Sequence, residues 1–362
     1  MTKIFVPQPI PETAVTRLEA IGNVEIYPHV DRQIPREELL KAVRDKDVLF
    51  AVGEIPYDEP LIEAAEQLQL IAAMHGSAKF VDFAAATRRN IPVTGLPYGM
   101  ITKTTAEFTF ALLMATAWRL PEADAFLREG RWHQNQSMAF MGTRLLGKTL
   151  GIVGMGSIGQ MVAHRAVACD MDIIYNKRTR LSPAEEYVLG GAEFRSLEEL
   201  FTEADFVALT PALTEETKGL VGEELISLMK PSSILINTSR GAVLDEAALE
   251  TALIEGHIRG AGLDVYETEV PEENPGPLKG LMSLPNVVFA PHIGSAARET
   301  REEMALRTVS NIERFLAGER PYPVLNPEVF GEAPIKDERI GWINIPWRTR
   351  EGVWETGRAV RG

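Results

Sequence analysis

The sequence has little cysteine, and it lacks long apolar runs and a signal segment. Its 362 residues include one cysteine, Cys169, so no internal disulfide can form and a reducing compartment fits. No apolar run approaches the roughly 20 residues of a membrane-spanning helix. The first residues, MTKIFVPQPIPETAV, lack the apolar core of a signal peptide. We therefore expect a cytoplasmic protein.

Basic residues are also in short supply. The 37 Lys and Arg are outnumbered by 51 Asp and Glu, which leaves a formal net charge of −14. Nucleic acid and anionic membranes attract broad basic surfaces, so neither is expected as a partner. The sequence contains no zinc-ligand spacing and no G-x-S-x-G motif, so neither a metal site nor a serine hydrolase is expected.

Hydrophobic residues make up 45% of the chain, and 362 residues are too many for one compact unit, so two domains are expected. In the first hundred residues, short apolar runs alternate with helical patterns. The expected strands are 3–7, 23–27, 47–53, 68–74 and 91–95, and the expected helices are 11–22, 35–45, 58–67 and 81–89. This alternation predicts an α/β fold with a parallel sheet and helices on both faces.

Later segments repeat the alternation. A second series runs from Thr149 to His292 and predicts a second parallel sheet. Residues 102–120 form an apolar helical pattern on nearly all sides, so this helix is expected to be buried on most of them. The helical pattern of 296–319 ends at Gly318.

The last 32 residues, 331–362, have a different character. They hold Trp342, Trp347 and Trp354, three of the five tryptophans, whereas a disordered tail is normally poor in aromatics. Two interpretations stay open: a tail folded over its own body, or an arm that reaches a neighbouring subunit or an active-site cleft.

A glycine-rich loop opens the second series. Gly154, Gly156 and Gly159, with Ser157 and Ile158 between them, form G-x-G-x-x-G between a predicted strand and a predicted helix. The first glycine permits a tight turn, the second lets the backbone approach a pyrophosphate, and the third lets helix pack on strand. The helix N-terminus then offers free N–H groups to phosphates, so the loop predicts a dinucleotide site.

A basic cluster follows where an acid is usual. The next strand ends about 20 residues beyond the loop, where an Asp or Glu commonly holds the adenosine ribose. Here the chain has Asn176, Lys177, Arg178, Thr179 and Arg180. Asn176 does not repel a 2′-phosphate, and the three cations can pair with one. The alternative is a solvated basic turn, but the position favours NADP(H), with NADPH preferred and NAD possible.

Three later strand ends carry an arginine, a carboxylate and a histidine. In open α/β sheets, ligands bind at the carboxyl ends of the strands, so Arg240, Glu269 and His292 should meet at one edge. A guanidinium can hold a 2-oxoacid carboxylate and polarise its carbonyl, and a histidine can supply a proton. A neighbouring carboxylate keeps that histidine protonated by raising its pKa. The three residues therefore predict carbonyl reduction.

With these motifs the chain resembles the D-isomer-specific 2-hydroxyacid dehydrogenase family, which includes glyoxylate/hydroxypyruvate reductases. The similarity spans roughly 1–330 and rests on GKTLGIVGMGSIGQ, PSSILINTSRGAVLDEAALETAL, GAGLDVYETEVP and PNVVFAPHIGSA. It implies two doubly wound parallel-sheet domains, a Rossmann-type cofactor domain inserted into a flavodoxin-like substrate domain. The expected division is 1–98 and 298–330 for the substrate domain, 99–297 for the NAD(P)-binding domain, and 331–362 for an extension of unknown role.

The resemblance also implies residue roles and a homodimer built on the cofactor domain, which would give the helix 102–120 a partner. Arg240 would bind substrate, His292 would be the acid/base and contact substrate, Glu269 would be its partner, and Asp264 would contact the nicotinamide carboxamide. The remaining expected cofactor contacts are Thr210, Pro211, Thr238, Ser239, Gly294 and Ser295.

One motif departs from the family. Members usually carry a glycine-rich S-x-G-x-D loop whose amides bind the substrate carboxylate, whereas residues 75–80 here read HGSAKF. Gly76 and Ser77 are the expected amide donors, and Lys79 adds an unusual charge, which leaves the identity of the substrate open. We expect an NADP(H)-dependent oxidoreductase that interconverts a small 2-oxoacid and its D-2-hydroxy acid. The alternatives are a phosphonate-dehydrogenase-like oxidoreductase and a non-catalytic cofactor-sensing binding protein.

Overall fold

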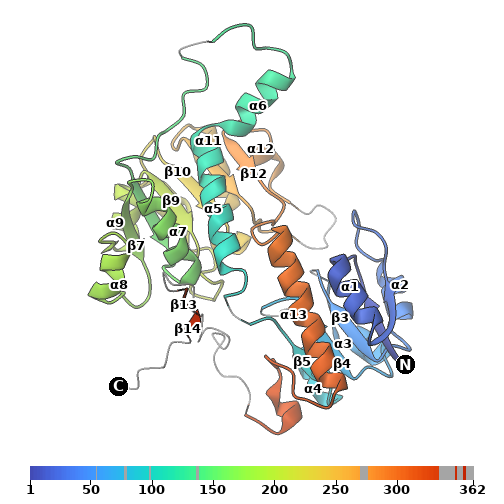
Figure 1. Ribbon diagram of the computed structural model, residues 1–362. Helices are drawn as coiled ribbons and strands as arrows, with labels where there is room; N and C mark the ends of the chain where they lie inside the picture. Colours follow the sequence, from blue (N-terminus) through green and yellow to red (C-terminus); the bar gives the residue numbers. More distant parts are fainter. Residues whose placement is uncertain are drawn as a thin grey trace. The chain divides into compact units, whose positions relative to one another are not determined.

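The computed structural model describes residues 1–53, 55–76, 80–97, 99–135, 138–269 and 276–333, with the strand pairs 347–348 and 354–355. The chain divides into two compact units (Figure 1). Unit 1 comprises residues 1–101 and 297–362, and unit 2 comprises residues 102–296. Among the described helices, none combines the length and apolar character that crossing a bilayer requires.

Unit 1 is built on a five-stranded parallel sheet with the order β2-β1-β3-β4-β5, the flavodoxin-like order. Helices α1 and α13 cover one face and α2, α3 and α4 the other. The strands are β1 (Thr2–Val6), β2 (Gly22–Ile26), β3 (Val48–Ala51), β4 (Leu70–Ala73) and β5 (Val93–Thr94). The helices are α1 (Glu12–Glu19), α2 (Arg36–Ala42), α3 (Glu59–Ala64), α4 (Phe83–Arg88), α13 (Arg298–Leu316) and the 3₁₀-helix η2 (Pro327–Phe330).

Local signals in the sequence account for where these helices begin and end. The side chain of Asp58 accepts the amide of Leu61 at the start of α3, and Asp82 accepts that of Ala85 at the start of α4. Helix α13 stops before Gly318, whose φ of +75° lies in the left-handed region that favours glycine. The helices and strands expected in the first hundred residues are all present, with ends shifted by a few residues.

Unit 2 is built on a seven-stranded parallel sheet with the order β12-β11-β10-β9-β6-β7-β8, the doubly wound Rossmann order with one more strand. The strands are β6 (Thr149–Val153), β7 (Asp172–Asn176), β8 (Glu193–Phe194), β9 (Phe206–Leu209), β10 (Ile234–Asn237), β11 (Gly260–Leu263) and β12 (Val287–Phe289). The helices are α5 (Thr102–Ala117), α6 (Leu120–Arg128), α7 (Ser157–Val167), α8 (Pro183–Val188), α9 (Leu197–Glu203), α10 (Glu223–Ile226), η1 (Gly241–Val243), α11 (Glu246–Ile254) and α12 (Lys279–Met282).

Two apolar cores sandwich this sheet. Helices α5 and α7 lie side by side against one face (Figure 1), and α9, α10 and α11 cover the other. The expected second parallel sheet and the predicted α/β class, with two parallel sheets, are therefore confirmed. The last strand pair, β13 (Trp347–Arg348) with β14 (Trp354–Glu355), is antiparallel. The other residues of 334–362 lie outside the described part of the chain. The two interpretations of this segment, a folded tail or an arm, depend on them.

Helix α5 corrects one expectation. It ends at Ala117 rather than at residue 120, and its buried residues occupy a single stripe at helical spacing: Thr102, Thr105, Ala106, Thr109, Leu112, Leu113, Thr116 and Ala117. The remaining face bears Met114, and Trp118 beyond the helix is 51% exposed. Phe108 and Phe110 flank this stripe and pack partly against the same core, so the helix is covered on most sides, as its apolar pattern predicted.

Candidate active site

The glycine loop joins the end of β6 to the start of α7. Gly154 has φ +92°, and a Cβ there would lie 2.5 Å from the nitrogen of Pro211, so this turn requires glycine. A Cβ on Gly159 would lie 2.6 Å from the carbonyl oxygen of Gly154 and 3.0 Å from Oγ1 of Thr210, which is the close approach of helix to strand that the third glycine permits. A Cβ on Gly156 would meet nothing within 4 Å. The middle glycine thus faces open space at the N-terminus of α7, as a phosphate-approach position needs.

The residues around the loop are held by the fold. The hydroxyl of Thr210 donates to the carbonyl of Gly154 at 2.8 Å, so this side chain fixes the loop. Ser157 begins α7, with its hydroxyl 3.4 Å from that of Thr102, and Ile158 packs on the core between α7 and the sheet.

The basic turn after β7 divides into two parts. Arg180 forms two hydrogen bonds to Glu186, at 2.8 and 3.0 Å, and Glu186 also accepts the hydroxyl of Tyr175 at 2.7 Å. Its guanidinium is therefore engaged with a carboxylate of its own chain. Lys177 and Arg178 form no ion pair with any residue in the described ranges, and Arg178 is exposed.

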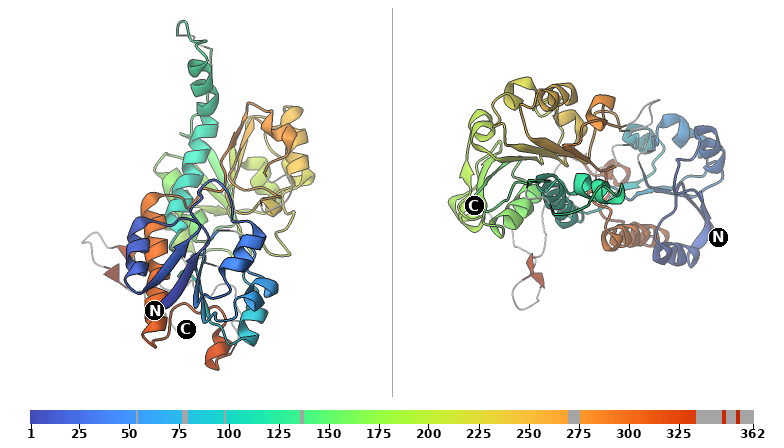
Figure 2. Two further views of the ribbon diagram at one scale, coloured as in Figure 1. Left: turned by 90° about the vertical axis from the view of Figure 1, so that its right-hand side faces the viewer. Right: turned by 90° about the horizontal axis from the view of Figure 1, so that it is seen from above.

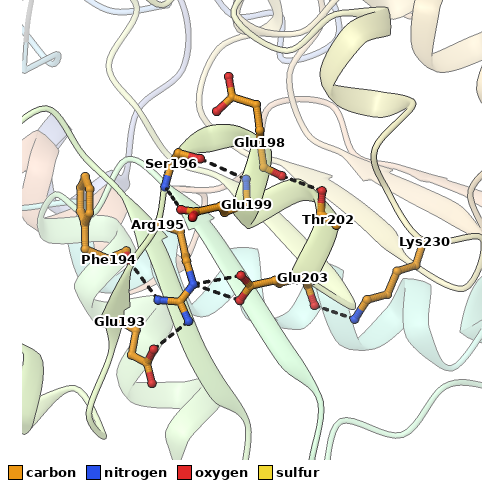
Figure 3. Close-up of polar contacts among 9 residues, drawn as sticks. All are labelled: Glu193, Phe194, Arg195, Ser196, Glu198, Glu199, Thr202, Glu203 and Lys230. Atoms are coloured by element: carbon orange, nitrogen blue, oxygen red, sulfur yellow. Dashed lines mark hydrogen bonds and ion pairs between the residues drawn. The ribbon is translucent and has the colours of Figure 1, made fainter.

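Asn176 is likewise fixed. Its amide donates to the backbone carbonyl of Arg195 at 2.8 Å, just beyond β8. The Arg195 side chain lies between Glu193 and Glu203, with hydrogen bonds of 2.7 and 3.0 Å (Figure 3). Figure 3 also shows the capping box at the start of α9, in which the Glu199 amide donates to Ser196 Oγ and the Ser196 amide donates to the Glu199 carboxylate. Because two acids neutralise Arg195, the cations near Asn176 that are open to a ligand are Lys177 and Arg178. Thr179, beside them, is exposed.

The loops after β11 and β12 bring the predicted acid/base pair together. Nδ1 of His292 lies 2.9 Å from Oε2 of Glu269, and the other carboxylate oxygen accepts the backbone amide of Tyr266 at 2.8 Å. Burial alone would raise the pKa of Glu269, but the hydrogen bond and positive charge of His292, with the Tyr266 amide and Arg240, outweigh it and lower that pKa. By the same coupling, Glu269 favours the protonated imidazole.

The backbone at His292 is itself unusual. His292 has φ +53°, a left-handed conformation that is uncommon for a residue with a side chain. Its amide donates to the carbonyl of Asp264 at 2.9 Å, and the buried carboxylate of Asp264 accepts the next two amides, from Ile293 at 2.8 Å and Gly294 at 2.9 Å. Asp264 thus anchors the turn that carries His292, while Ser295, next in the chain, is half-buried. Burial raises the pKa of Asp264.

Arg240 is brought to the same edge by the loop after β10. A Cβ on Gly241 would lie 1.8 Å from the carbonyl carbon of Tyr266, so the two loops touch backbone to backbone. The guanidinium of Arg240 donates to the carbonyl of Ser239 at 2.6 Å and forms no other hydrogen bond with a described residue. The buried Asn237 ties the turn by accepting the amide and hydroxyl of Ser239.

Thr238, the first residue after β10, is oriented by α5. The hydroxyl of Thr109 donates to the carbonyl of Thr105, so the 2.6 Å contact between Thr109 and Thr238 has Thr238 as donor. The Thr238 oxygen keeps its acceptor capacity, as contact with a ribose hydroxyl requires.

The predicted amide donors of the substrate loop belong to unit 1. Gly76 follows β4, and a Cβ there would meet nothing within 4 Å. His75 lies 3.0 Å from the carbonyl of Gly53. Ser77 and Lys79 lie outside the described residues. The contribution of this loop to substrate binding stays a prediction.

Residues that the sequence alone did not single out support the site. Tyr266 fixes Glu269 through its amide, and its hydroxyl donates to the carbonyl of Ala290 at 2.7 Å. Asn237 and Gly241 fix the Arg240 turn. Their position directly beside the predicted catalytic residues was the signal that could have identified them. Their backbone contacts could not be predicted, because these depend on how two separate loops meet.

Comparison with known proteins finds similarity over most of the chain. Residues 110–294 match the family described as D-isomer specific 2-hydroxyacid dehydrogenase, NAD binding domain. The glyoxylate reductase of Thermococcus litoralis is 44% identical over 336 residues, 92% of this chain and 99% of that protein. That of Thermococcus kodakarensis is 46% identical over 331 residues, 90% of this chain and 97% of its own length.

Solved structures show the same likeness. The TT0316 protein of Thermus thermophilus superposes with a TM-score of 0.79 at 40% identity, covering 90% of this chain and all of that one. The NADPH-dependent glyoxylate/hydroxypyruvate reductase of Sinorhizobium meliloti, solved with NADP and malonate, gives a TM-score of 0.72 at 29% identity, covering 92% and 99%.

Proposed function

The chain belongs to the D-isomer-specific 2-hydroxyacid dehydrogenase family, and we propose that it reduces glyoxylate or a similarly small 2-oxoacid with NADPH. As a member it is an NAD(P)-dependent oxidoreductase, which confirms the resemblance seen in its motifs. Unit 2 is then the cofactor domain and unit 1 the substrate domain, in a cytoplasmic enzyme.

The observation that carries the proposal is the 2.9 Å contact between His292 and Glu269 at the carboxyl edge of the unit 2 sheet. Arg240 lies on the adjoining loop, and its charge contributes to the lowered pKa of Glu269. Reduction of a charged carbonyl compound requires a cation, a carboxylate and an imidazole beside the cofactor. All three groups lie at the sheet edge where the dinucleotide loop also ends.

The loop fits a dinucleotide. Open space at Gly156, the N-terminus of α7 and the acceptor on Thr238 suit a pyrophosphate and a ribose. Asp264, which already accepts two backbone amides, would face the carboxamide, beside Gly294 and Ser295. When bound, the reduced nicotinamide supplies a hydride.

The protein's own groups supply the rest of the reaction. Arg240 binds the substrate carboxylate and polarises the carbonyl. His292, protonated and held by Glu269 through Nδ1, donates the proton on Nε2 to the carbonyl oxygen as the carbon accepts hydride. One NADPH and one proton are therefore consumed for each 2-oxoacid reduced to the 2-hydroxy acid.

Preference for NADPH is assigned to Lys177 and Arg178. Both are open to a ligand at the end of β7, while Asn176 supplies no negative charge to repel a 2′-phosphate. Arg180, first grouped with them, is excluded because it is paired with Glu186.

The exposed apolar surface of unit 2 supports a homodimer. Helix α6 buries none of its residues in this chain and projects beyond the sheet (Figure 2). Trp118, Leu120, Leu127 and Trp132, on and around it, are exposed. Such a cluster is typical of a subunit interface, and a second copy of the chain is the proposed partner.

The test is NADPH absorbance at 340 nm with glyoxylate, hydroxypyruvate and pyruvate, in wild type and in His292→Ala. Turnover that is lost in His292→Ala and kept in His164→Ala, an exposed histidine of α7, supports the proposal. Turnover of phosphite alone, with NAD(P) as acceptor, would favour the phosphonate-dehydrogenase alternative. Tight NADPH binding with no turnover would favour a cofactor-sensing binding protein.

A further inference from the structure

One buried carboxylate beside the site takes no part in the proposed chemistry. Glu246 is the first residue of α11 and is 3% exposed. The helix is capped by Asp245, whose side chain accepts the amide of Ala248 at 3.0 Å, so Glu246 is not needed as the cap. A buried carboxylate without a capping or catalytic task needs another explanation, because burial of such a group is unfavourable unless it is hydrogen-bonded.

The hydrogen bonds of Glu246 lead to the loop that carries Glu269. One carboxylate oxygen accepts the amide of Glu267 at 2.7 Å, and the other lies 3.4 Å from the amide of Leu278. Glu246 therefore holds the chain where it leaves β11 and again where it returns toward α12. Between these two points the amide of Gly276 donates to the carbonyl of Thr268 at 2.7 Å.

Each residue from Tyr266 to Glu269 is thus held by at least one hydrogen bond. The Tyr266 hydroxyl is tied to Ala290, Glu267 to Glu246, Thr268 to Gly276, and Glu269 to the Tyr266 amide and His292. Among these contacts, the bond from Glu246 is the one in which a buried side chain of another element holds a backbone amide of this segment. Its loss would free the peptide two residues before Glu269.

We propose that Glu246 is a positioning residue, which sets Glu269 beside His292 by holding the amide of Glu267. The inference rests on the proposed function, since it assigns a role in the same acid/base pair. Three acids, Glu246, Glu267 and Glu269, converge here with Asp264, Tyr266 and His292. Burial, with the charges of Glu267 and Glu269, raises the pKa of Glu246. Ionised or protonated, a carboxyl oxygen can still accept an amide, so the bond persists in both forms.

Two variants of Glu246 distinguish the length of its side chain from its negative charge. Glu246→Asp keeps the charge but is one methylene shorter, so its carboxylate cannot reach the Glu267 amide. Glu246→Gln loses the charge but keeps the reach and an accepting oxygen. Glu255→Asp, on the exposed end of the same helix, is the matched control.

Glu246→Asp should lower kcat for glyoxylate by about tenfold to a hundredfold, as displacement of catalytic groups by about 1 Å does. The KM for NADPH should change by less than about twofold. Glu246→Gln should keep kcat within about threefold of wild type. Wild-type kcat in the Asp variant would overturn the proposal, and so would equal damage in both variants.

A second measurement needs no substrate. The pKa of His292 is read by NMR on histidine-labelled protein, with His292→Ala giving the assignment. Glu246→Asp should lower this pKa toward the value in Glu269→Gln, and adding it to Glu269→Gln should lower it no further. An additive shift would show that Glu246 acts independently of Glu269 and would overturn the inference. If wild type showed the elevated pKa but reduced no 2-oxoacid, the proposed function would fail while the positioning role stood.

Discussion

Replacing both Lys177 and Arg178 with alanine should remove the preference for NADPH over NADH. These are the cations at the end of β7 that form no ion pair with described residues, and Asn176 beside them carries no charge. The adenosine 2′-phosphate distinguishes the two cofactors, so a side chain that reads it affects NADPH alone. The double variant should therefore lose affinity for NADPH while its KM for NADH stays nearly unchanged.

The structure limits the size of this effect. A hydrogen bond to a charged group contributes about 1.5–3 kcal/mol, and exposure places Arg178 at the lower end of that range. Two such bonds give about 3 kcal/mol, which corresponds to roughly 100-fold in affinity. Arg180 adds nothing to this sum, because its guanidinium is held by Glu186 at 2.8 and 3.0 Å.

The assay is the ratio of kcat/KM for NADPH to that for NADH, which should fall by roughly 100-fold in the double variant. Lys279→Ala is the control, an exposed lysine on α12, which precedes β12 at the opposite edge of the sheet. Salt should weaken NADPH binding in wild type more than in the variant. Equal losses for both cofactors would refute the reasoning, since the turn would then not be reading the phosphate.

Three further outcomes follow from the geometry. Reductive kcat/KM should fall as pH rises through the pKa of His292. In Glu269→Gln the fall should begin at lower pH, because the charge that favours the imidazolium is gone, and an unshifted profile would contradict the pairing. Gly241→Ala should lower the free energy of unfolding by about 1–3 kcal/mol, since its Cβ would lie 1.8 Å from the carbonyl carbon of Tyr266; an unchanged Tm would exclude that contact. Trp118→Glu should give a monomer by light scattering with NADPH binding intact, whereas a wild-type mass would place the dimer interface elsewhere.

The fold was predictable from local patterns because the residues at and near the ends of each helix and strand mark where it begins and ends. Asp58 and Asp82 cap helices that follow them directly, and the glycine at 318 ends α13. Strand order is a nonlocal property, yet alternating strands and helices restrict it, since right-handed crossovers permit few arrangements. The burial of helix α5 on most sides was likewise predictable from its apolar pattern, whereas its end at Ala117 was not.

The site was predictable as a set of strand ends but not as a set of contacts. That Arg240, Glu269 and His292 share one edge follows from parallel strands, whose carboxyl ends coincide. That Arg180 is taken up by Glu186 could not be read from the run of cations, because the pairing depends on the turn that Tyr175 fixes. Sequence shows which charges are present at a site, and the fold decides which of them are already paired.

Contacts between neighbouring loops couple the proposed catalytic groups to one another. Asp264 holds the turn of His292 by accepting the amides of Ile293 and Gly294, and its own amide donates to the carbonyl of Asn237 at 3.0 Å. Asn237 in turn fixes the loop of Arg240. A displacement at any of these three strand ends is therefore transmitted to the others, since a backbone bond links Asp264 to Asn237 and the Asp264 side chain is bonded to the turn of His292. Substitutions at Asn237 or Asp264 should accordingly impair proton transfer and substrate binding together, which separates them from Lys177 and Arg178, whose loss concerns the cofactor alone.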